Sequence, residues 1–358
     1  MDERLALLRE LTDAPGVSGY EHEVREILRK RLAGFAEVGQ DNLGSIVFRK
    51  QGSAPEPRIM LPGHMDEIGF LVSFITKEGF LKFVPVGGWW DQVMLGQRVV
   101  VKTSAGDVPG VIGSKPPHIL PDEERKKVVE KKDMFIDVGA RDREEATDTF
   151  GIRPGDPIVP VSPFAVLKNE KLLMAKAWDD RLGCALFVDV LRHLAGAEHP
   201  NAVYGVGTTQ EEVGLRGAQT SADVVNPDIS IAMEVAIAGD MPGVKEEDAP
   251  VKLGGGPVLY VVDARLIPNR RLKDLVIDTA RAENIPLQFA TMMGGATDAG
   301  AITVHGQGVP AVSFGIPTRY IHTHAGIINR DDYDASVRLV LAIIKKLDRT
   351  TVDYIKQA

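Results

Sequence analysis

The stretch KLLMAKAWDDRLGCALFVDVLRHLAGAEHPNAVYGVGTT, residues 171–209, decides the fold class. Its apolar run at 171–175 predicts a strand, apolar residues at helical spacing over 180–195 predict a helix, and a second apolar run at 202–209 predicts another strand. Strands that alternate with helices are typical of a sheet covered by helices on both faces. We therefore expect an α/β protein.

The same alternation extends in both directions from this stretch. Toward the N-terminus, helices are predicted over 2–13 and from Ser18, where Ser18 and Glu21 have the spacing of a capping box. Further strands are predicted near 45–48, 58–61, 229–235, 258–262, 287–291 and 311–314, with helices near 270–283 and 334–347. In sheets of this kind, ligands gather where the strands end.

Residues 69–163 have a different character, with almost no helical periodicity. Apolar runs separated by turn residues form two predicted β-hairpins, 70–76 with 80–86 and 97–102 with 108–112. We therefore expect an inserted β domain at 69–163. Residues 1–68 and 164–358 then form one discontinuous catalytic domain.

Composition excludes several classes of protein. Of 358 residues, 42 are Lys or Arg and 50 are Asp or Glu, and the net charge of −8 argues against nucleic acid or an anionic membrane as the main partner. Charged residues interrupt any signal-peptide core near the N-terminus, and no run of about 18 uncharged apolar residues predicts a transmembrane span. The single cysteine, Cys184, excludes an intrachain disulfide. We expect a cytoplasmic protein.

Five short segments place His, Asp or Glu at predicted strand ends. They are Gly63-His64-Met65-Asp66, Trp178-Asp179-Asp180-Arg181, Thr209-Gln210-Glu211-Glu212-Val213-Gly214, Met233-Glu234-Val235 and Tyr320-Ile321-His322-Thr323-His324. Each alone is weak evidence, because a single surface histidine or carboxylate pair is usually structural or solvated. Together they supply two imidazoles and several carboxylates, as a divalent metal site requires.

A dinuclear site needs a particular set of ligands. Two ions about 3.5–4 Å apart require a carboxylate that bridges them, and each ion needs an imidazole and a further carboxylate. A carboxylate that binds no metal must also take and return the proton of an activated water. The pair Glu211-Glu212 suits this division, because adjacent side chains diverge.

The order of six segments resembles one family closely. The segments GHMDEIGF (63–70), AWDDRLG (177–183), TTQEEVGLRGA (208–218), MEVAIAGD (233–240), GGATDAGAI (294–302) and RYIHTHAG (319–326) are similar to those of the tetrahedral, or TET, aminopeptidases. These enzymes belong to the dinuclear metallopeptidases and include glutamyl and leucyl aminopeptidases, and some relatives carry the label endoglucanase or cellulase M. The resemblance covers nearly the whole chain. It implies a three-layer catalytic domain of the zinc-peptidase type with a mixed central sheet, and an inserted, barrel-like dimerisation domain.

The resemblance also implies a role for each site residue. It assigns metal ligation to His64, Asp179, Glu212, Glu234 and His322. Asp179 would bridge two divalent ions and be followed by a cis peptide bond, Glu212 and His322 would complete one ion, and Glu234 would join His64 on the other. Asp66 would orient the His64 imidazole, and Glu211 would act as general base and acid. We expect Zn²⁺, and Co²⁺ accepts the same ligand types.

Two alternative enzymes stay open at this stage. Relatives usually have Asp at the position of Glu234, and Glu there is more usual in carboxypeptidases and deacylases of the wider clan, so these activities are alternatives to an aminopeptidase. The cellulase label raises glycoside hydrolysis, which needs a spaced carboxylate pair and usually no histidine ligands. A non-catalytic scaffold is a third alternative, although it would have no need to keep Glu211.

Other residues have two interpretations each. His324 lines the cleft or binds metal, His118 approaches a neighbouring active site or is a turn residue, and Asp298 binds the substrate's α-amine or caps a helix. In the family the inserted domain joins subunits into dimers, often assembled into a hollow dodecamer that admits short peptides. Trp89, Trp90 and Phe83 are candidates for such an interface or for a core.

Overall fold

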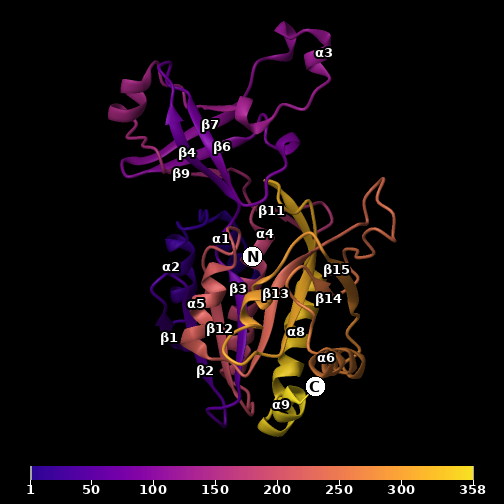
Figure 1. Cartoon of the computed structure of the whole chain (residues 1–358). Coiled ribbons are helices and arrows are strands. Elements are labelled where there is room, and N and C mark those ends of the chain that lie inside the picture. The colour runs from indigo at the N-terminus through magenta and orange to yellow at the C-terminus, as the bar shows by residue number, and fades with distance from the viewer. Residues whose placement is uncertain (1, 358) are drawn as a thin grey trace.

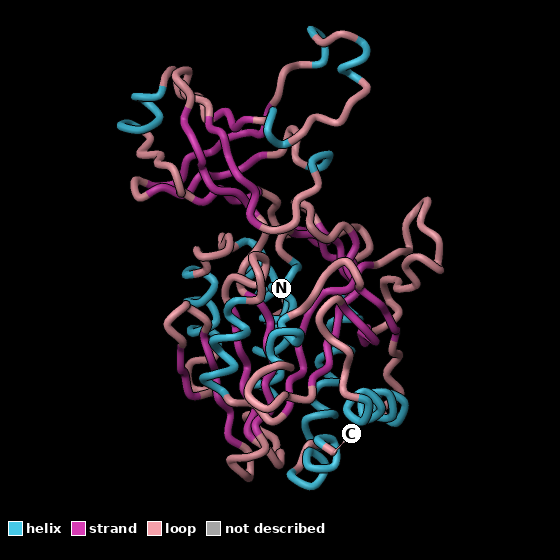
Figure 2. Tube along the Cα trace, viewed as in Figure 1, coloured by secondary structure: helices cyan, strands magenta, loops and turns pink. Residues whose placement is uncertain are grey.

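An eleven-stranded mixed sheet forms the body of the molecule, and a closed six-stranded barrel stands at one end of it (Figures 1 and 2). The computed structural model describes residues 2–357. Residues 1 and 358, the ends of the predicted catalytic domain, lie outside the described residues. This arrangement confirms the predicted α/β class with an additional β-barrel.

The sheet is mixed because a parallel centre continues into antiparallel edges. Strands β12, β3, β13 and β16 are parallel neighbours in that order, and β2 and β17 pair antiparallel beside them. Its strands are β1 (Glu37–Gln40), β2 (Ile46–Gln51), β3 (Arg58–His64), β10 (Ala165–Val166), β11 (Leu172–Ala175), β12 (Ala202–Thr208), β13 (Ile229–Ile237), β14 (Val258–Asp263), β15 (Gln288–Met292), β16 (Ala311–Arg319) and β17 (Gly326–Asn329).

Helices cover both faces of this sheet and give three layers. One face packs against α1 (Glu3–Asp13), α2 (His22–Arg31), α4 (Trp178–Leu194), α6 (Arg270–Ala282), α8 (Arg330–Lys346) and α9 (Arg349–Lys356). The other packs against α5 (Arg216–Val225) and α7 (Asp298–Ile302). Alternation along β3 decides the sides, since Ile59 and Leu61 join the first core and Met60 the second.

The barrel contains the two predicted hairpins. Strands β4 and β5 pair antiparallel, as do β6 and β7. Its strands are β4 (Gly69–Ile75), β5 (Leu81–Val86), β6 (Arg98–Thr103), β7 (Gly106–Gly113), β8 (Phe135–Asp137) and β9 (Pro157–Pro160). Short helical turns lie between them, namely η1 (Asp91–Val93), η2 (Pro117–Ile119), α3 (Asp122–Arg125), η3 (Lys131–Asp133) and η4 (Glu145–Thr149).

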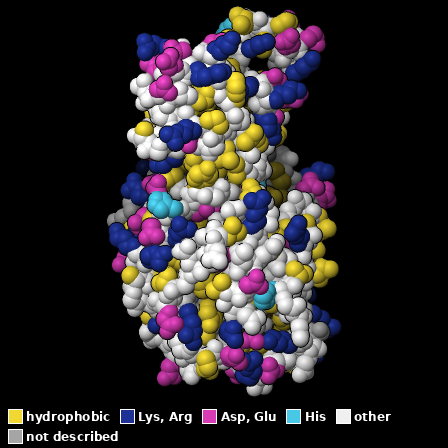
Figure 3. All heavy atoms as spheres, turned by 60° about the vertical axis from the view of Figure 1, so that its left-hand side comes forward, with side chains coloured by type: hydrophobic (Ala, Val, Ile, Leu, Met, Phe, Trp, Pro, Cys, Tyr) yellow, Lys and Arg dark blue, Asp and Glu magenta, His cyan; other side chains and the backbone are white. Residues whose placement is uncertain are grey.

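Two tryptophans of the barrel have different surroundings. Trp89 lies in the barrel core, where it stacks on Phe70 and its indole N–H donates to the carbonyl of Gly69 at 3.0 Å. Trp90 is 60% exposed. Of the two, only Trp90 remains a candidate for an interface. Figure 3 shows apolar side chains gathered where the barrel meets the body.

The predicted capping box at Ser18 is wrong. Helix α2 begins at His22, and the Ser18 hydroxyl instead donates to Asp66 Oδ2 at 2.6 Å. Glu21 accepts from the backbone N–H groups of Gly19 and Gln210. The Ser18 hydroxyl therefore bonds to the buried carboxylate of Asp66, far along the chain, and does not cap the helix.

None of the helices in residues 2–357 has the length and apolar character that a membrane crossing requires.

Candidate metal centre

The carboxyl ends of four parallel strands bring the predicted site residues to the edge of the sheet next to the barrel. His64 is the last residue of β3, and Glu234 lies in β13. Glu211 and His322 each follow a strand end by three residues, after β12 and β16. Asp179 comes from the first turn of α4. Residues far apart in the sequence therefore meet at one place, as the strand-end pattern predicted.

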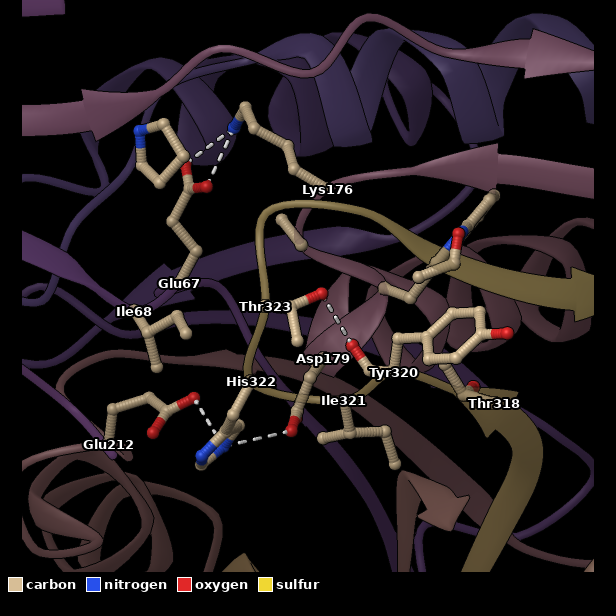
Figure 4. A pocket seen from close by; sticks show the side chains of 14 residues that line it. Glu67, Ile68, Lys176, Asp179, Glu212, Thr318, Tyr320, Ile321, His322 and Thr323 are labelled. Atoms are coloured by element: carbon tan, nitrogen blue, oxygen red, sulfur yellow. Dashed lines mark hydrogen bonds and ion pairs between the residues drawn. The ribbon is translucent and has the colours of Figure 1, made fainter. Parts of the chain in front are cut away.

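Asp179 stands between the two histidines. Its Oδ1 lies 2.9 Å from His64 Nε2, and its Oδ2 lies 3.4 Å from His322 Nε2. Figure 4 shows the His322 side of this arrangement. Burial raises the pKa of Asp179, but the hydrogen bonds with His322 and His64 outweigh it and lower that pKa below its usual value. Each oxygen of one carboxylate thus faces a different imidazole, which is the disposition that a bridging ligand needs.

Glu212 completes the group around His322. Its Oε1 lies 3.4 Å from His322 Nε2, while His322 Nδ1 forms a 2.9 Å hydrogen bond with the carbonyl oxygen of Gly88. Burial lowers the pKa of His322, but Asp179 and Glu212 raise it to about 11. The contact with Gly88 leaves Nε2 directed at the two carboxylates.

Glu234 belongs to a second group around His64, which also contains Asp180. Ligand atoms of His64, Asp180 and Glu234 lie within 4.8 Å of one another, and the backbone N–H of Asp298 donates to Glu234 Oε1 at 3.3 Å. Burial raises the pKa of Glu234 well above its usual value, and Asp180 raises it further. The structure therefore brings Glu234 to His64, together with a carboxylate that received no role in the sequence analysis.

Both oxygens of the Asp180 carboxylate already accept hydrogen bonds from the backbone. Oδ2 accepts from the backbone N–H of His64 at 3.1 Å, and Oδ1 accepts from that of Gly183 at 2.9 Å. The Asp179–Asp180 peptide bond is cis, as the resemblance implied. Asp180 thus links the end of β3 to the start of α4, a role that its position beside Asp179 could have suggested.

Asp66 holds both glutamates of the site through their backbone. Its Oδ1 accepts from the N–H of Glu211 at 3.0 Å and its Oδ2 from the N–H of Glu212 at 3.1 Å. The Asp66 carboxylate lies 3.5 Å from His64 Nδ1, whereas the backbone carbonyl of Asp66 lies 3.0 Å away. The imidazole is therefore oriented more closely by the backbone of Asp66 than by its side chain.

Glu211 faces the cluster without a close imidazole contact. Its Oε2 lies 3.8 Å from His64 Nε2. Burial raises the pKa of Glu211 well above its usual value, and Glu234 and Asp298 raise it further although His64 opposes them. A carboxyl group with a raised pKa is suited to exchanging a proton near neutral pH.

A cavity of about 880 Å³ opens over these residues. Its lining includes the cluster of site residues, His64, Asp179, Glu211, Glu212, Glu234 and His322. The rest of its wall is mostly apolar and includes Leu215, Ile237, Met241, Tyr260, Met292 and Met293. This volume lies in the range of small-molecule sites. A substrate in the cavity would contact the cluster on one side and apolar groups on the other.

The residues present fit divalent cations. Glu212 Oε1 is buried, and its one polar contact within residues 2–357 is the 3.4 Å approach of His322 Nε2, which is no regular hydrogen bond. Buried carboxylates are costly when ionised unless cations neutralise them. Imidazole nitrogens and carboxylate oxygens are ligands that Zn²⁺ and related ions accept. The donor set therefore suits a metal centre better than a purely organic site.

The remaining candidates lie in different places. His118 is exposed in the turn η2 of the barrel. Nδ1 of His324 is buried without a hydrogen-bond partner among the described residues. Asp298 is fully buried, and its carboxylate accepts from the Thr208 hydroxyl at 2.5 Å. Its contact with the site residues is the hydrogen bond from its backbone N–H to Glu234.

A cluster of imidazoles and carboxylates at the strand ends of such a sheet is typical of metal-dependent hydrolases. The M42 glutamyl aminopeptidase family matches residues 44–339, and the chain belongs to this family of metal-dependent aminopeptidases, which hydrolyse peptide bonds.

Three relatives illustrate the match. The chain is 42% identical to the putative aminopeptidase FrvX of Escherichia coli over 99% of this chain and 98% of that protein. The TET aminopeptidase structure from Thaumarchaeota archaeon SCGC AB-539-E09 is 50% identical with a TM-score of 0.97, over 99% of this chain and 100% of that one. The TET1 peptidase of Pyrococcus horikoshii, which can assemble into a tetrahedron or a large octahedral shell, is 32% identical with a TM-score of 0.86, over 96% and 100%.

Proposed function

We propose that this protein removes N-terminal residues from short peptides and uses two divalent ions and Glu211. The observation that carries the proposal is Asp179, whose two oxygens face two different imidazoles at 2.9 and 3.4 Å. The proposed ligands are His64, Asp179 and Glu234 for one ion, and Asp179, Glu212 and His322 for the other. Zn²⁺ is the expected metal.

The chemistry divides between the ions and the side chains. When bound, the ions polarise the scissile carbonyl and lower the pKa of a water molecule. Glu211 takes a proton from the attacking water while the oxygen of that water forms a bond to the carbonyl carbon. It then gives this proton to the amine nitrogen as the carbon–nitrogen bond breaks. Asp66 fixes the backbone of Glu211 for both transfers.

A test of the base role compares two variants. Glu211→Gln is expected to keep both metal equivalents but to reduce kcat on an aminoacyl-anilide by about 10²–10⁴-fold. Glu123→Gln, on an 85% exposed side chain of the barrel, is the matched control and is expected to leave kcat unchanged. A Glu211→Gln variant as fast as the wild type would exclude this mechanism.

A test of the reaction class uses blocked substrates. An aminopeptidase needs a free α-amine, whereas a deacylase or carboxypeptidase, the alternatives raised by Glu234, does not. We expect cleavage of free aminoacyl-anilides and none of their N-acetyl forms, loss of activity on chelation, and no release of sugar from cellulosic substrates. Cleavage of the N-acetyl forms would reject the aminopeptidase proposal.

We also propose that the barrel joins subunits into dimers that assemble further. The Pyrococcus horikoshii relative can assemble into a tetrahedron or a large octahedral shell. The exposed Trp90 supports this proposal. Light scattering on the wild type and on Trp90→Ser tests it. A monomeric wild type would contradict it.

A further inference from the structure

Three charged side chains next to the metal centre are buried and bound to one another. Glu67, Lys176 and Arg181 are 2%, 5% and 0% exposed. Lys176 Nζ donates to both carboxylate oxygens of Glu67 at 2.7 Å, and Arg181 Nη2 lies 3.4 Å from Glu67 Oε1. The reaction proposed above uses none of these groups.

This ion cluster joins three segments of chain. Glu67 belongs to the segment that follows His64, and Lys176 to the segment that precedes Asp179. The third segment is the turn after α1, where Lys176 Nζ donates to the carbonyl of Ala14 at 3.0 Å and the backbone N–H of Gly16 donates to Glu67 Oε1 at 3.1 Å. The turn therefore fastens the two segments that carry metal ligands.

Arg181 extends the same connection into helix α4. Its Nη1 donates to the carbonyl oxygens of Leu11 at 2.6 Å and Ala14 at 3.1 Å. Arg181 follows Asp179 by two residues, so Asp179 lies between two cations anchored on the same turn. Figure 4 shows Glu67 and Lys176 lining the same small pocket as Asp179, Glu212 and His322.

Stability alone is a poor reason for such a cluster. Replacement of a buried ion pair by uncharged groups of similar volume is often neutral or stabilising, because desolvation of both ions offsets their attraction. Hydrogen bonds that orient metal ligands from outside the coordination shell have a different value, since their loss typically reduces metal affinity or activity by about 10–100-fold.

We infer that Glu67, Lys176 and Arg181 are positioning residues that hold the His64 and Asp179 segments in place for metal binding before the metal arrives. The inference rests on the proposed dinuclear site. It extends that site, because none of the three side chains is a proposed ligand or proton donor in the reaction.

The first experiment uses the wild-type chain. Amide hydrogen exchange is measured over peptides that cover residues 64–67 and 176–181, with metal bound and after chelation. We expect protection in the metal-free protein to stay within about tenfold of the metal-bound protein, because the ion cluster keeps these segments ordered. Exchange that is 100-fold faster without metal would show that the metal itself orders them, and would overturn the inference.

The second experiment measures metal affinity by competition with a chelator. Lys176→Met is expected to weaken metal binding by about 10–100-fold and to lower kcat at limiting metal, with little change in KM. Lys171→Met is the matched control, because Lys171 forms a 2.6 Å ion pair with Asp331 on the surface, where it is 64% exposed. The control is expected to bind metal like the wild type.

A double variant separates positioning from stability. Glu67→Gln combined with Lys176→Met removes two opposite charges together, and Arg181 keeps its hydrogen bonds to the carbonyl oxygens of Leu11 and Ala14, so the unfolding temperature should lie closer to that of the wild type than that of Lys176→Met does. We expect its metal affinity to stay reduced by at least tenfold. Affinity within twofold of the wild type, in this variant or in Lys176→Met, would reduce the cluster to a structural role. The proposed dinuclear site is tested separately on the wild type. If the wild type fails to bind two equivalents of metal, the proposed function itself is rejected.

Discussion

Asp66→Asn tests whether the carboxylate behind the metal centre places the general base. The Asp66 side chain is fully buried and accepts three hydrogen bonds, from Ser18 Oγ and from the backbone N–H groups of Glu211 and Glu212. Asparagine has the same shape but offers one accepting oxygen and one NH₂ donor.

The size of the effect follows from these contacts. If Nδ2 takes the position of Oδ1, it faces the N–H of Glu211, and that donor loses its acceptor. If it takes the position of Oδ2, the Ser18 hydroxyl can rotate and accept, but the N–H of Glu212 loses its acceptor. Either way one buried backbone donor is unsatisfied, which costs about 1–3 kcal/mol in the free energy of unfolding.

The assay combines urea denaturation with steady-state kinetics at saturating metal. Because the affected donors belong to the two glutamates of the site, we expect kcat to fall by about 10–100-fold while KM changes little. Asp331→Asn, on a 55% exposed side chain, controls for the loss of a carboxylate. If Asp66→Asn is destabilised but turns over at the wild-type rate, Asp66 does not position Glu211 and the reasoning is refuted.

Four further predictions concern other parts of the molecule. Gly88→Ala should weaken metal binding and lower kcat, because the new Cβ would lie 2.8 Å from His322 Nδ1. Gly196→Ala is the control and should change neither, because its Cβ would have no atom within 4 Å. Equal metal affinities of the two variants would contradict this prediction. Hydrogen bonds from Lys356 and Arg58 outweigh burial and lower the pKa of Asp228 below 3.8, so this carboxylate stabilises the fold above about pH 4 and the contribution is lost as pH falls through the lowered pKa. Asp228→Asn should therefore show a weaker pH dependence of urea unfolding below pH 4, and an unchanged slope would count against it. Chelation should lower the unfolding temperature, and free Zn²⁺ at 100 times its Kd should restore about 2.7 kcal/mol per site, as measured by calorimetry; no change would mean that the folded chain binds no metal. The cavity wall is mostly apolar and carries one cation, Arg265, so leucyl- and methionyl-anilides should be cleaved faster than lysyl-anilides, and Ile237→Asp should reduce kcat/KM for the leucyl substrate; a preference for lysyl substrates would contradict this.

Strong periodicity made much of the fold predictable. The helix predicted over 180–195 is α4 at Trp178–Leu194, and the hairpin runs of the insert are strands of the barrel. Strand β1 has no such signal, because all four of its residues, Glu37–Gln40, are exposed and only pairing with β2 orders them. Helix α5 has buried residues at helical spacing, namely Gly217, Ala218, Ser221, Ala222 and Val225, but most of them are small, so no run of large apolar residues marks the helix in the sequence.

The site likewise has a part that the sequence predicts and a part that it does not. Residues within the motifs could be predicted because each side chain has its own chemistry at a strand end. The contacts of Ser18 and Gly88 could not, because they depend on which segments the fold brings together. A serine at position 18 fits a helix cap by local rules, and only the buried carboxylate of Asp66, 48 residues away, decides otherwise.

The barrel has a direct connection to the metal centre. Gly88, whose carbonyl orients His322, precedes Trp89, and Trp89 is fixed in the barrel core by its stack on Phe70. Trp90 follows, and its side chain is 60% exposed. Contact with another subunit at Trp90 would therefore reach His322 through two consecutive residues of one segment. Because a metal ligand depends on the orientation that its other ring nitrogen receives, the two proposals predict a link between them: if the barrel joins subunits and His322 binds metal, Trp90→Ser should change metal affinity as well as the mass measured by light scattering.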